Sequence, residues 1–100
     1  RLMQLKGTWF DLFGLLRELA PQYQSIQEVR GLGMLVGIEF DSPVKDIVGQ
    51  CLAQGLIVGT AGENVLRLLP PLTTTREEID EAVSILRSAL ESVHHENAQA

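Results

Sequence analysis

The 100 residues suit one small domain, and the content of 45% hydrophobic and 21% charged residues is typical of a globular protein. The net charge of −5, the lack of a basic stripe and the few aromatic residues argue against nucleic-acid binding. No apolar run approaches the roughly 20 residues that a membrane-spanning helix needs, so we expect no membrane partner. The single cysteine, Cys51, excludes an internal disulfide bond and fits a cytoplasmic protein.

The first part of the chain is predicted to form a helix followed by a β-hairpin. Apolar residues recur at three- and four-residue steps in the opening segment, and Pro21 ends this helical pattern. Extended segments follow over residues 25–30 and 34–40, and the second alternates in the manner of a strand. Gly31 and Gly33 lie between them and supply the backbone freedom of a tight reversal, which favours a hairpin.

A second helix and two short strands are predicted next. Ser42 can cap the helix, Pro43 suits its first position, and Gly55 supplies a left-handed residue at its end. Strands are expected over residues 56–58 and 65–69, joined by a loop.

The last helix is marked by a capping box, because Glu78 follows Thr75 at the required spacing. The resulting order predicts an α+β fold: a small, mainly antiparallel sheet of three to four strands with helices packed on one face. The predicted core combines one face of the 34–40 strand with the apolar stripes of the two later helices: Met34, Val36, Ile38, Val48, Leu52, Val83, Leu86 and Leu90.

Most residues that could carry chemistry are better explained structurally. Cys51 lies on an apolar helix stripe without a basic neighbour, which indicates a buried structural cysteine. Lys6 and Lys45 lie on helical segments and lack the surroundings of a Schiff-base lysine. The adjacent His94 and His95 do not share a helix face, so we expect no metal site. We therefore predict no catalytic, cofactor-binding or metal-binding residue in this chain.

Arg67 is the exception, because it is the only charge in the apolar run 65–69. A buried, unpaired guanidinium would be very costly, so Arg67 needs either a carboxylate partner or an open cleft. One interpretation is a structural salt bridge to Glu39 or Glu63. The other is a planar, two-pronged clamp for a substrate carboxylate. The residues alone leave both interpretations open.

Two stretches of the chain resemble segments of class III pyridoxal-phosphate aminotransferases. Residues 29–40, VRGLGMLVGIEF, are similar to the family's VRGxGLMxGIE segment. Residues 61–72, AGENVLRLLPPL, are similar to its AGxNVxRLxPPL segment, and residues 75–80, TREEID, continue it as TxEEID. The wording of the second stretch favours the acetylornithine and ornithine branch, while the opening residues 1–25 match only as a leading helix.

The resemblance implies that residues 1–100 form the C-terminal small domain of a larger, homodimeric fold-type I aminotransferase. The large domain of such an enzyme holds the pyridoxal phosphate and the Schiff-base lysine. By its place in the motif, Arg67 corresponds to the arginine that holds the substrate α-carboxylate. The chain alone would then be inactive, would bind no cofactor, and would expose apolar surface through which it could self-associate.

The implied reaction moves an amino group between N-acetylornithine, or an ornithine-like donor, and 2-oxoglutarate in arginine biosynthesis. The sequence does not distinguish acetylornithine, succinylornithine and ornithine as the donor. It also leaves open whether the chain is a truncated gene, a proteolytic product or a deliberately cut piece. The alternative is a free-standing α+β module that binds a ligand or partner without catalysis.

Overall fold

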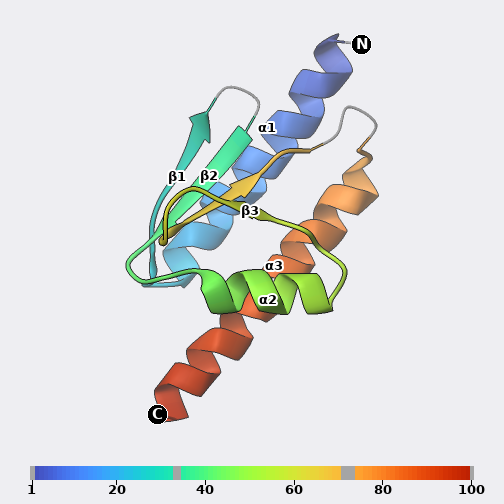
Figure 1. Ribbon diagram of the computed structural model, residues 1–100. Helices are drawn as coiled ribbons and strands as arrows, with labels where there is room; N and C mark the ends of the chain where they lie inside the picture. Colours follow the sequence, from blue (N-terminus) through green and yellow to red (C-terminus); the bar gives the residue numbers. More distant parts are fainter. Residues whose placement is uncertain (1, 33–34, 71–73, 100) are drawn as a thin grey trace.

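A computed structural model describes residues 2–32, 35–70 and 74–99, with side chains described for 9–31, 35–70 and 74–93. The elements follow one another as α1 (Leu2–Leu19), a 3-10 turn (Ala20–Gln22), β1 (Ile26–Leu32), β2 (Leu35–Phe40), α2 (Lys45–Ala53), β3 (Gly59–Thr60), β4 (Val65–Leu68) and α3 (Arg76–Gln99). Figure 1 shows α1 and α3 running beside the sheet, with α2 crossing near one end of it. Among the described residues, no helix is both long and apolar enough to cross a membrane.

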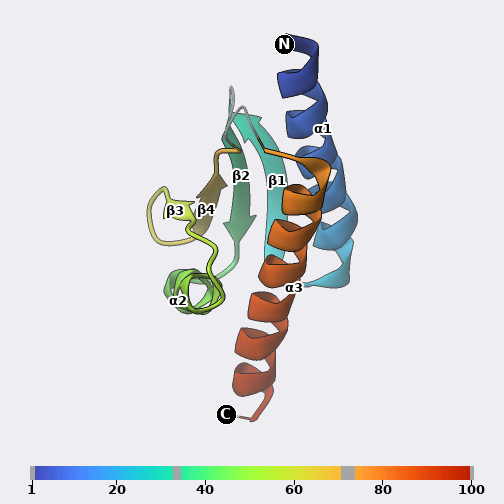
Figure 2. The ribbon, with the colours of Figure 1, turned by 90° about the vertical axis from the view of Figure 1, so that its right-hand side faces the viewer.

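The domain has two layers, a sheet and the helices that cover one of its faces. The strands lie in the order β1-β2-β4-β3, and each neighbouring pair is antiparallel. Figure 2 shows α1 and α3 on the same side of the sheet, while no described helix lies over the opposite side of β1 and β2. The predicted α+β fold, with helices packed on one face of a small antiparallel sheet, is therefore confirmed.

The core lies between the sheet and the two long helices. Of the predicted core residues, five are buried: Val36, Ile38, Val83, Leu86 and Leu90. Val48 is half-buried against this core, and Met34 lies outside the described residues.

Leu52 was predicted in the core, and this prediction is wrong because its side chain is 60% exposed. The buried residues next to and within α2 are instead Val44, Ile47 and Cys51, which recur at helical spacing. The apolar stripe read from the sequence is therefore wider than the face that the helix buries. Leu52 follows Cys51 by one residue, which turns it about 100° away from that buried line.

The start of α2 also differs from the prediction. The helix begins at Lys45, and the residue before it, Val44, caps it without a side-chain hydrogen bond. The backbone N–H of Val44 donates instead to the carbonyl of Glu63, at 2.8 Å. Since this tertiary contact holds the backbone at Val44, Ser42 and Pro43 remain outside the helix.

The third strand lies three residues later than predicted, at Gly59–Thr60 rather than over residues 56–58. The backbone N–H of Leu56 donates to the carbonyl of Cys51 at 2.8 Å, so it completes the end of α2 instead of pairing with another strand. Gly55 precedes it with φ of 93°, as predicted for the residue that ends this helix.

Candidate functional site

Arg67 lies in the middle of β4 and points away from the core. Its neighbours Leu66 and Leu68 are buried on the helix side of the sheet, while Arg67 is exposed. Successive side chains of a strand point to opposite faces, so the guanidinium belongs to the face without the long helices. Water therefore solvates this charge, and the cost of burying an unpaired guanidinium does not arise.

The predicted alternative, a salt bridge from Arg67 to Glu39 or Glu63, is not found. Within the described part of the chain, no ion pair or side-chain hydrogen bond involves the Arg67 guanidinium. Glu39 contacts Arg30 instead. The guanidinium donors of Arg67 are thus free to bind a carboxylate from outside this chain.

Glycine flanks Arg67 on both neighbouring strands. Gly37 of β2 and Gly59 of β3 are its cross-strand partners. A Cβ atom built at Gly59 would meet only the Arg67 carbonyl oxygen at 3.7 Å and the Arg67 Cβ at 3.9 Å, both ordinary contacts. Packing therefore does not require glycine at residue 59. The effect of the two glycines is that no side chain lies directly opposite Arg67 on either neighbouring strand.

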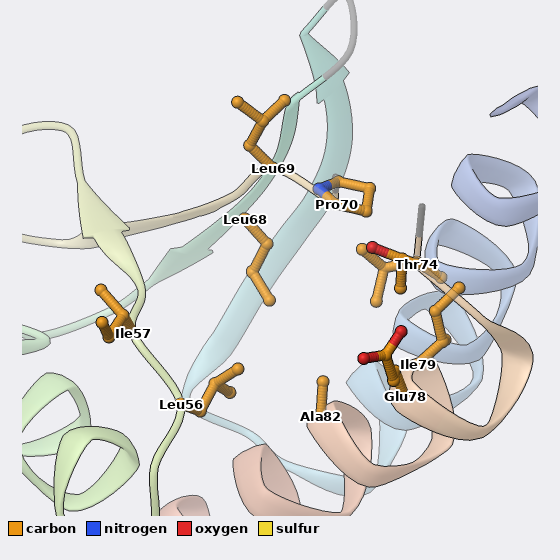
Figure 3. Close-up of a pocket in the computed structure, with 10 residues that line it drawn as sticks. Leu56, Ile57, Leu68, Leu69, Pro70, Thr74, Glu78, Ile79 and Ala82 are labelled. Carbon is orange, nitrogen blue, oxygen red and sulfur yellow. The ribbon is translucent and has the colours of Figure 1, made fainter. Parts of the chain in front are cut away.

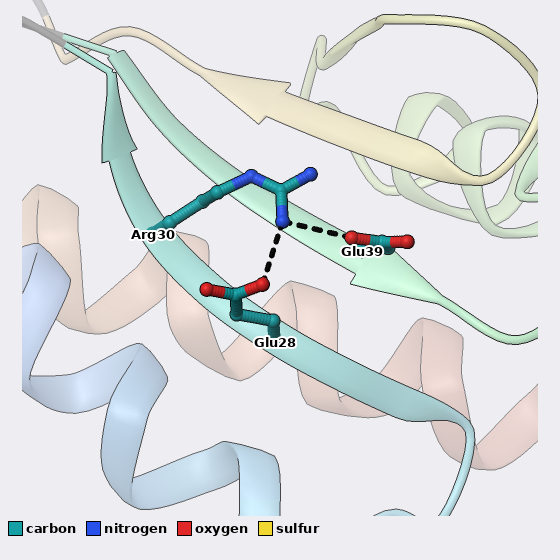
Figure 4. A network of polar contacts seen from close by, with 3 residues as sticks. All are labelled: Glu28, Arg30 and Glu39. Atoms are coloured by element: carbon teal, nitrogen blue, oxygen red, sulfur yellow. Dashed lines mark hydrogen bonds and ion pairs between the residues drawn. The ribbon is translucent and has the colours of Figure 1, made fainter.

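A second arginine on this face of the sheet forms ion pairs with two carboxylates. Arg30 of β1 places Nη1 2.7 Å from Glu28 Oε1 and 2.8 Å from Glu39 Oε1 (Figure 4). The hydrogen bond to Glu39 contributes most to raising the pKa of Arg30 above its ordinary value. The contact of Arg30 with Glu39 was not predicted from the sequence. The hairpin register could have revealed it, because Arg30 lies opposite Gly37 and Glu28 opposite Glu39.

An apolar hollow of about 330 Å³ lies elsewhere, between the end of β4 and the start of α3. Leu56, Leu68 and Ile79 line it, and Ile57 and Leu69 contribute side chains that are 84% and 60% exposed (Figure 3). Among its polar lining groups, the Glu78 carboxylate is already engaged in the predicted capping box with Thr75. The hollow thus lacks a free charged group and does not form one site with Arg67, which points to the other face.

None of the other residues that were weighed from the sequence is placed in a functional site by the described structure. Cys51 is completely buried, so the prediction of a buried structural cysteine is confirmed, and this burial raises the pKa of its thiol. Lys45 is exposed in the first turn of α2. The side chains of Lys6, His94 and His95 lie outside the described residues.

Comparison with known proteins gives one consistent family. Residues 10–90 match the family described as aminotransferase class-III. Acetylornithine aminotransferase of Bacillus subtilis (strain 168) is 51% identical over 70% of this chain and 18% of its own length. The Listeria innocua protein of the same name is 47% identical over 86% of this chain and 22% of its own length.

Solved structures agree with the sequence matches. The crystal structure of N-acetylornithine aminotransferase from Stenotrophomonas maltophilia superimposes with a TM-score of 0.84 at 26% identity, covering 93% of this chain and 27% of that one. The chain thus spans about a fifth of the curated relatives it matches. The family match covers most of the residues, and the fold agrees with it. The chain therefore belongs to the class-III aminotransferase family.

Proposed function

We propose that this chain is the C-terminal small domain of a pyridoxal-phosphate-dependent aminotransferase, and that the full-length protein moves an amino group from N-acetylornithine to 2-oxoglutarate. The observation that carries the proposal is Arg67, an exposed guanidinium without an ion-pair partner among the described residues, bordered by Gly37 and Gly59. The choice of donor is supported by the name shared by the curated relatives, acetylornithine aminotransferase. The ornithine-like donors are the second choice.

The described residues do not form a site for pyridoxal phosphate. Lys45 is exposed, without the apolar or cationic pocket that activates a Schiff-base lysine. Cys51 is sealed in the core, and the apolar hollow beside β4 offers no free charged group for a phosphate. The cofactor and the chemistry that it supplies therefore belong to the rest of the full-length protein.

Arg67 would contribute binding and orientation. A guanidinium presents a rigid fork of donors that matches a carboxylate in a two-pronged hydrogen bond. N-Acetylornithine carries its α-carboxylate beside the acetylated α-amino group, away from the δ-carbon whose amino group is transferred, whereas 2-oxoglutarate carries a carboxylate next to its reacting keto carbon. Arg67 can thus bind the α-carboxylate of either substrate, and it orients the reacting carbon directly in 2-oxoglutarate. Fixing that carboxylate fixes the direction of the bonds at the neighbouring carbon, which favours reaction by orientation.

The test is steady-state kinetics of the full-length enzyme with Arg67→Lys. Lysine keeps the charge but loses the fork, so we expect kcat/KM to fall about 10- to 100-fold for both the amino donor and 2-oxoglutarate, as expected for one lost charge-assisted hydrogen bond. The matched control is Arg87→Lys on α3, where Arg87 Nη1 donates to Gln22 Oε1 at 2.7 Å. An unchanged kcat/KM for both substrates in Arg67→Lys contradicts the proposed role.

The wider assignment includes a role in arginine biosynthesis, a homodimer in the full-length enzyme, a cytoplasmic location, and an inactive isolated chain. These points are supported by the family resemblance, and the location also by the single, buried Cys51. The alternative of a free-standing binding module is less well supported, since relatives of this sequence match it over only about a fifth of their length. An upstream reading frame that encodes a pyridoxal-phosphate-binding domain favours the enzyme, and its absence favours the module.

A further inference from the structure

Glu39 lies close enough to Arg67 to compete with a substrate for it. Arg67 is opposite Gly37 on β2, and Glu39 is two residues further along the same strand, so both side chains are on one face. Diagonal neighbours of this kind are about 7–8 Å apart at the backbone, a distance that two long side chains can bridge.

Arg30 already binds the Glu39 carboxylate. Its Nη1 lies 2.8 Å from Glu39 Oε1 and 2.7 Å from Glu28 Oε1. Figure 4 shows the Arg30 side chain extending from β1 across β2 toward Glu39. The residue opposite Arg30 is Gly37, so no side chain at that position blocks the path. Arg30, Gly37, Arg67 and Gly59 are thus cross-strand neighbours in a single row over four strands.

We propose that Arg30 is a positioning residue for the carboxylate site: by binding Glu39, it prevents that carboxylate from pairing with Arg67 and keeps Arg67 free for substrate. The inference rests on the proposed function of Arg67. Arg30 itself does not touch the substrate. Its removal would create an internal competitor, and the apparent affinity for every ligand that needs Arg67 would fall by the fraction of molecules in which Glu39 holds it.

The test is Arg30→Gln in the full-length holoenzyme. An exposed ion pair between Glu39 and Arg67 would raise KM for the donor and for 2-oxoglutarate about two- to sixfold, while kcat at saturation stays unchanged. Adding Glu39→Gln removes the competitor, so the double variant should return KM to the wild-type value. Arg30→Lys keeps a charge for Glu39 and should stay near wild type, which also covers the case in which Arg30→Gln folds poorly.

Arg76→Gln is the matched control. Arg76 also contacts two carboxylates, Asp80 and Asp11 at 3.2 and 3.4 Å, but it is exposed and lies on α3. Its loss should leave both KM values unchanged. A substrate-free crystal structure of Arg30→Gln should show Glu39 within hydrogen-bond distance of the Arg67 guanidinium, and this readout does not depend on activity.

The outcomes separate this inference from the proposed function. If Arg67→Lys impairs both substrates but Arg30→Gln leaves KM unchanged, the role of Arg30 is refuted and the role of Arg67 stands. If Arg30→Gln is impaired and Glu39→Gln does not restore it, Arg30 is only structural and the inference is overturned. If Arg67→Lys itself has no effect on either substrate, the proposed function fails, and the crystal structure alone then decides whether Arg30 separates Glu39 from Arg67.

Discussion

Gly31→Ala is predicted to destabilise the fold, because the indole of Trp9 leaves no room for a side chain there. A Cβ atom at Gly31 would lie 2.8 Å from Trp9 Cζ2 and 2.9 Å from Trp9 Cη2, closer than carbon atoms normally approach. The ring cannot swing aside without cost. It stacks on Phe13 with ring centroids 4.9 Å apart, and it meets Phe10 edge-on at 5.1 Å.

Two opposing terms set the size of the effect. Inserting a methyl group into an occupied space costs about 1–3 kcal/mol. Replacing glycine by alanine within a strand offsets about 0.5–1 kcal/mol of this, because the unfolded chain loses conformational freedom. The difference of the two terms is a fall of up to about 2.5 kcal/mol in the free energy of unfolding, and about 1 kcal/mol at the middle of both ranges.

The assay is urea unfolding of the chain followed by far-UV circular dichroism. Gly49→Ala is the control, since nothing lies within 4 Å of a Cβ built at Gly49 in α2. It should stabilise the chain by about 0.5–1 kcal/mol, the ordinary preference for alanine inside a helix. In a Trp9→Leu background the obstacle is smaller, so the cost of Gly31→Ala should shrink. Equal costs in both backgrounds would refute the reasoning.

Two further predictions concern the core and the surface. The pKa of the buried Cys51 thiol is raised above its ordinary value of 9.0, so the neutral thiol is favoured in the folded state. The stability that this contributes is complete below pH 9.0 and is lost as the pH rises toward the folded pKa, with a slope of at most about 1.4 kcal/mol per pH unit. Urea unfolding between pH 8 and 10 should show this loss in the wild type and not in Cys51→Ala, and parallel curves would contradict it. The isolated chain is expected to self-associate through the apolar surface around Ile57, which is 84% exposed. Sedimentation should show an average mass that rises with concentration and that falls in Ile57→Ser, whereas a strict monomer at all concentrations would count against this surface.

Several features that depend on neighbours in the sequence were predicted correctly. Thr75 and Glu78 form the capping box, with the Thr75 N–H 2.9 Å from Glu78 Oε1 and the Glu78 N–H 3.2 Å from Thr75 Oγ1. Gly55 has the positive φ expected at the end of α2. The alternation in β2 correctly placed Val36 and Ile38 in the core. Each of these features is decided within a few residues, by backbone geometry or by the period of a helix or strand.

Features that depend on contacts between distant segments were decided only by the tertiary structure. Leu52 is exposed because α2 buries a face narrower than its apolar stripe. Arg67 could have been paired or free, and the sequence could not choose, because the answer depends on the partner of Glu39. That partner follows from the registers of β1, β2 and β4, which put Arg30 and Arg67 on one face with Gly37 between them. A charged side chain pairs with a group that folding brings within hydrogen-bond distance. In a sheet, strand register sets the distance between the two groups, and the register is fixed only when distant segments of the chain pair.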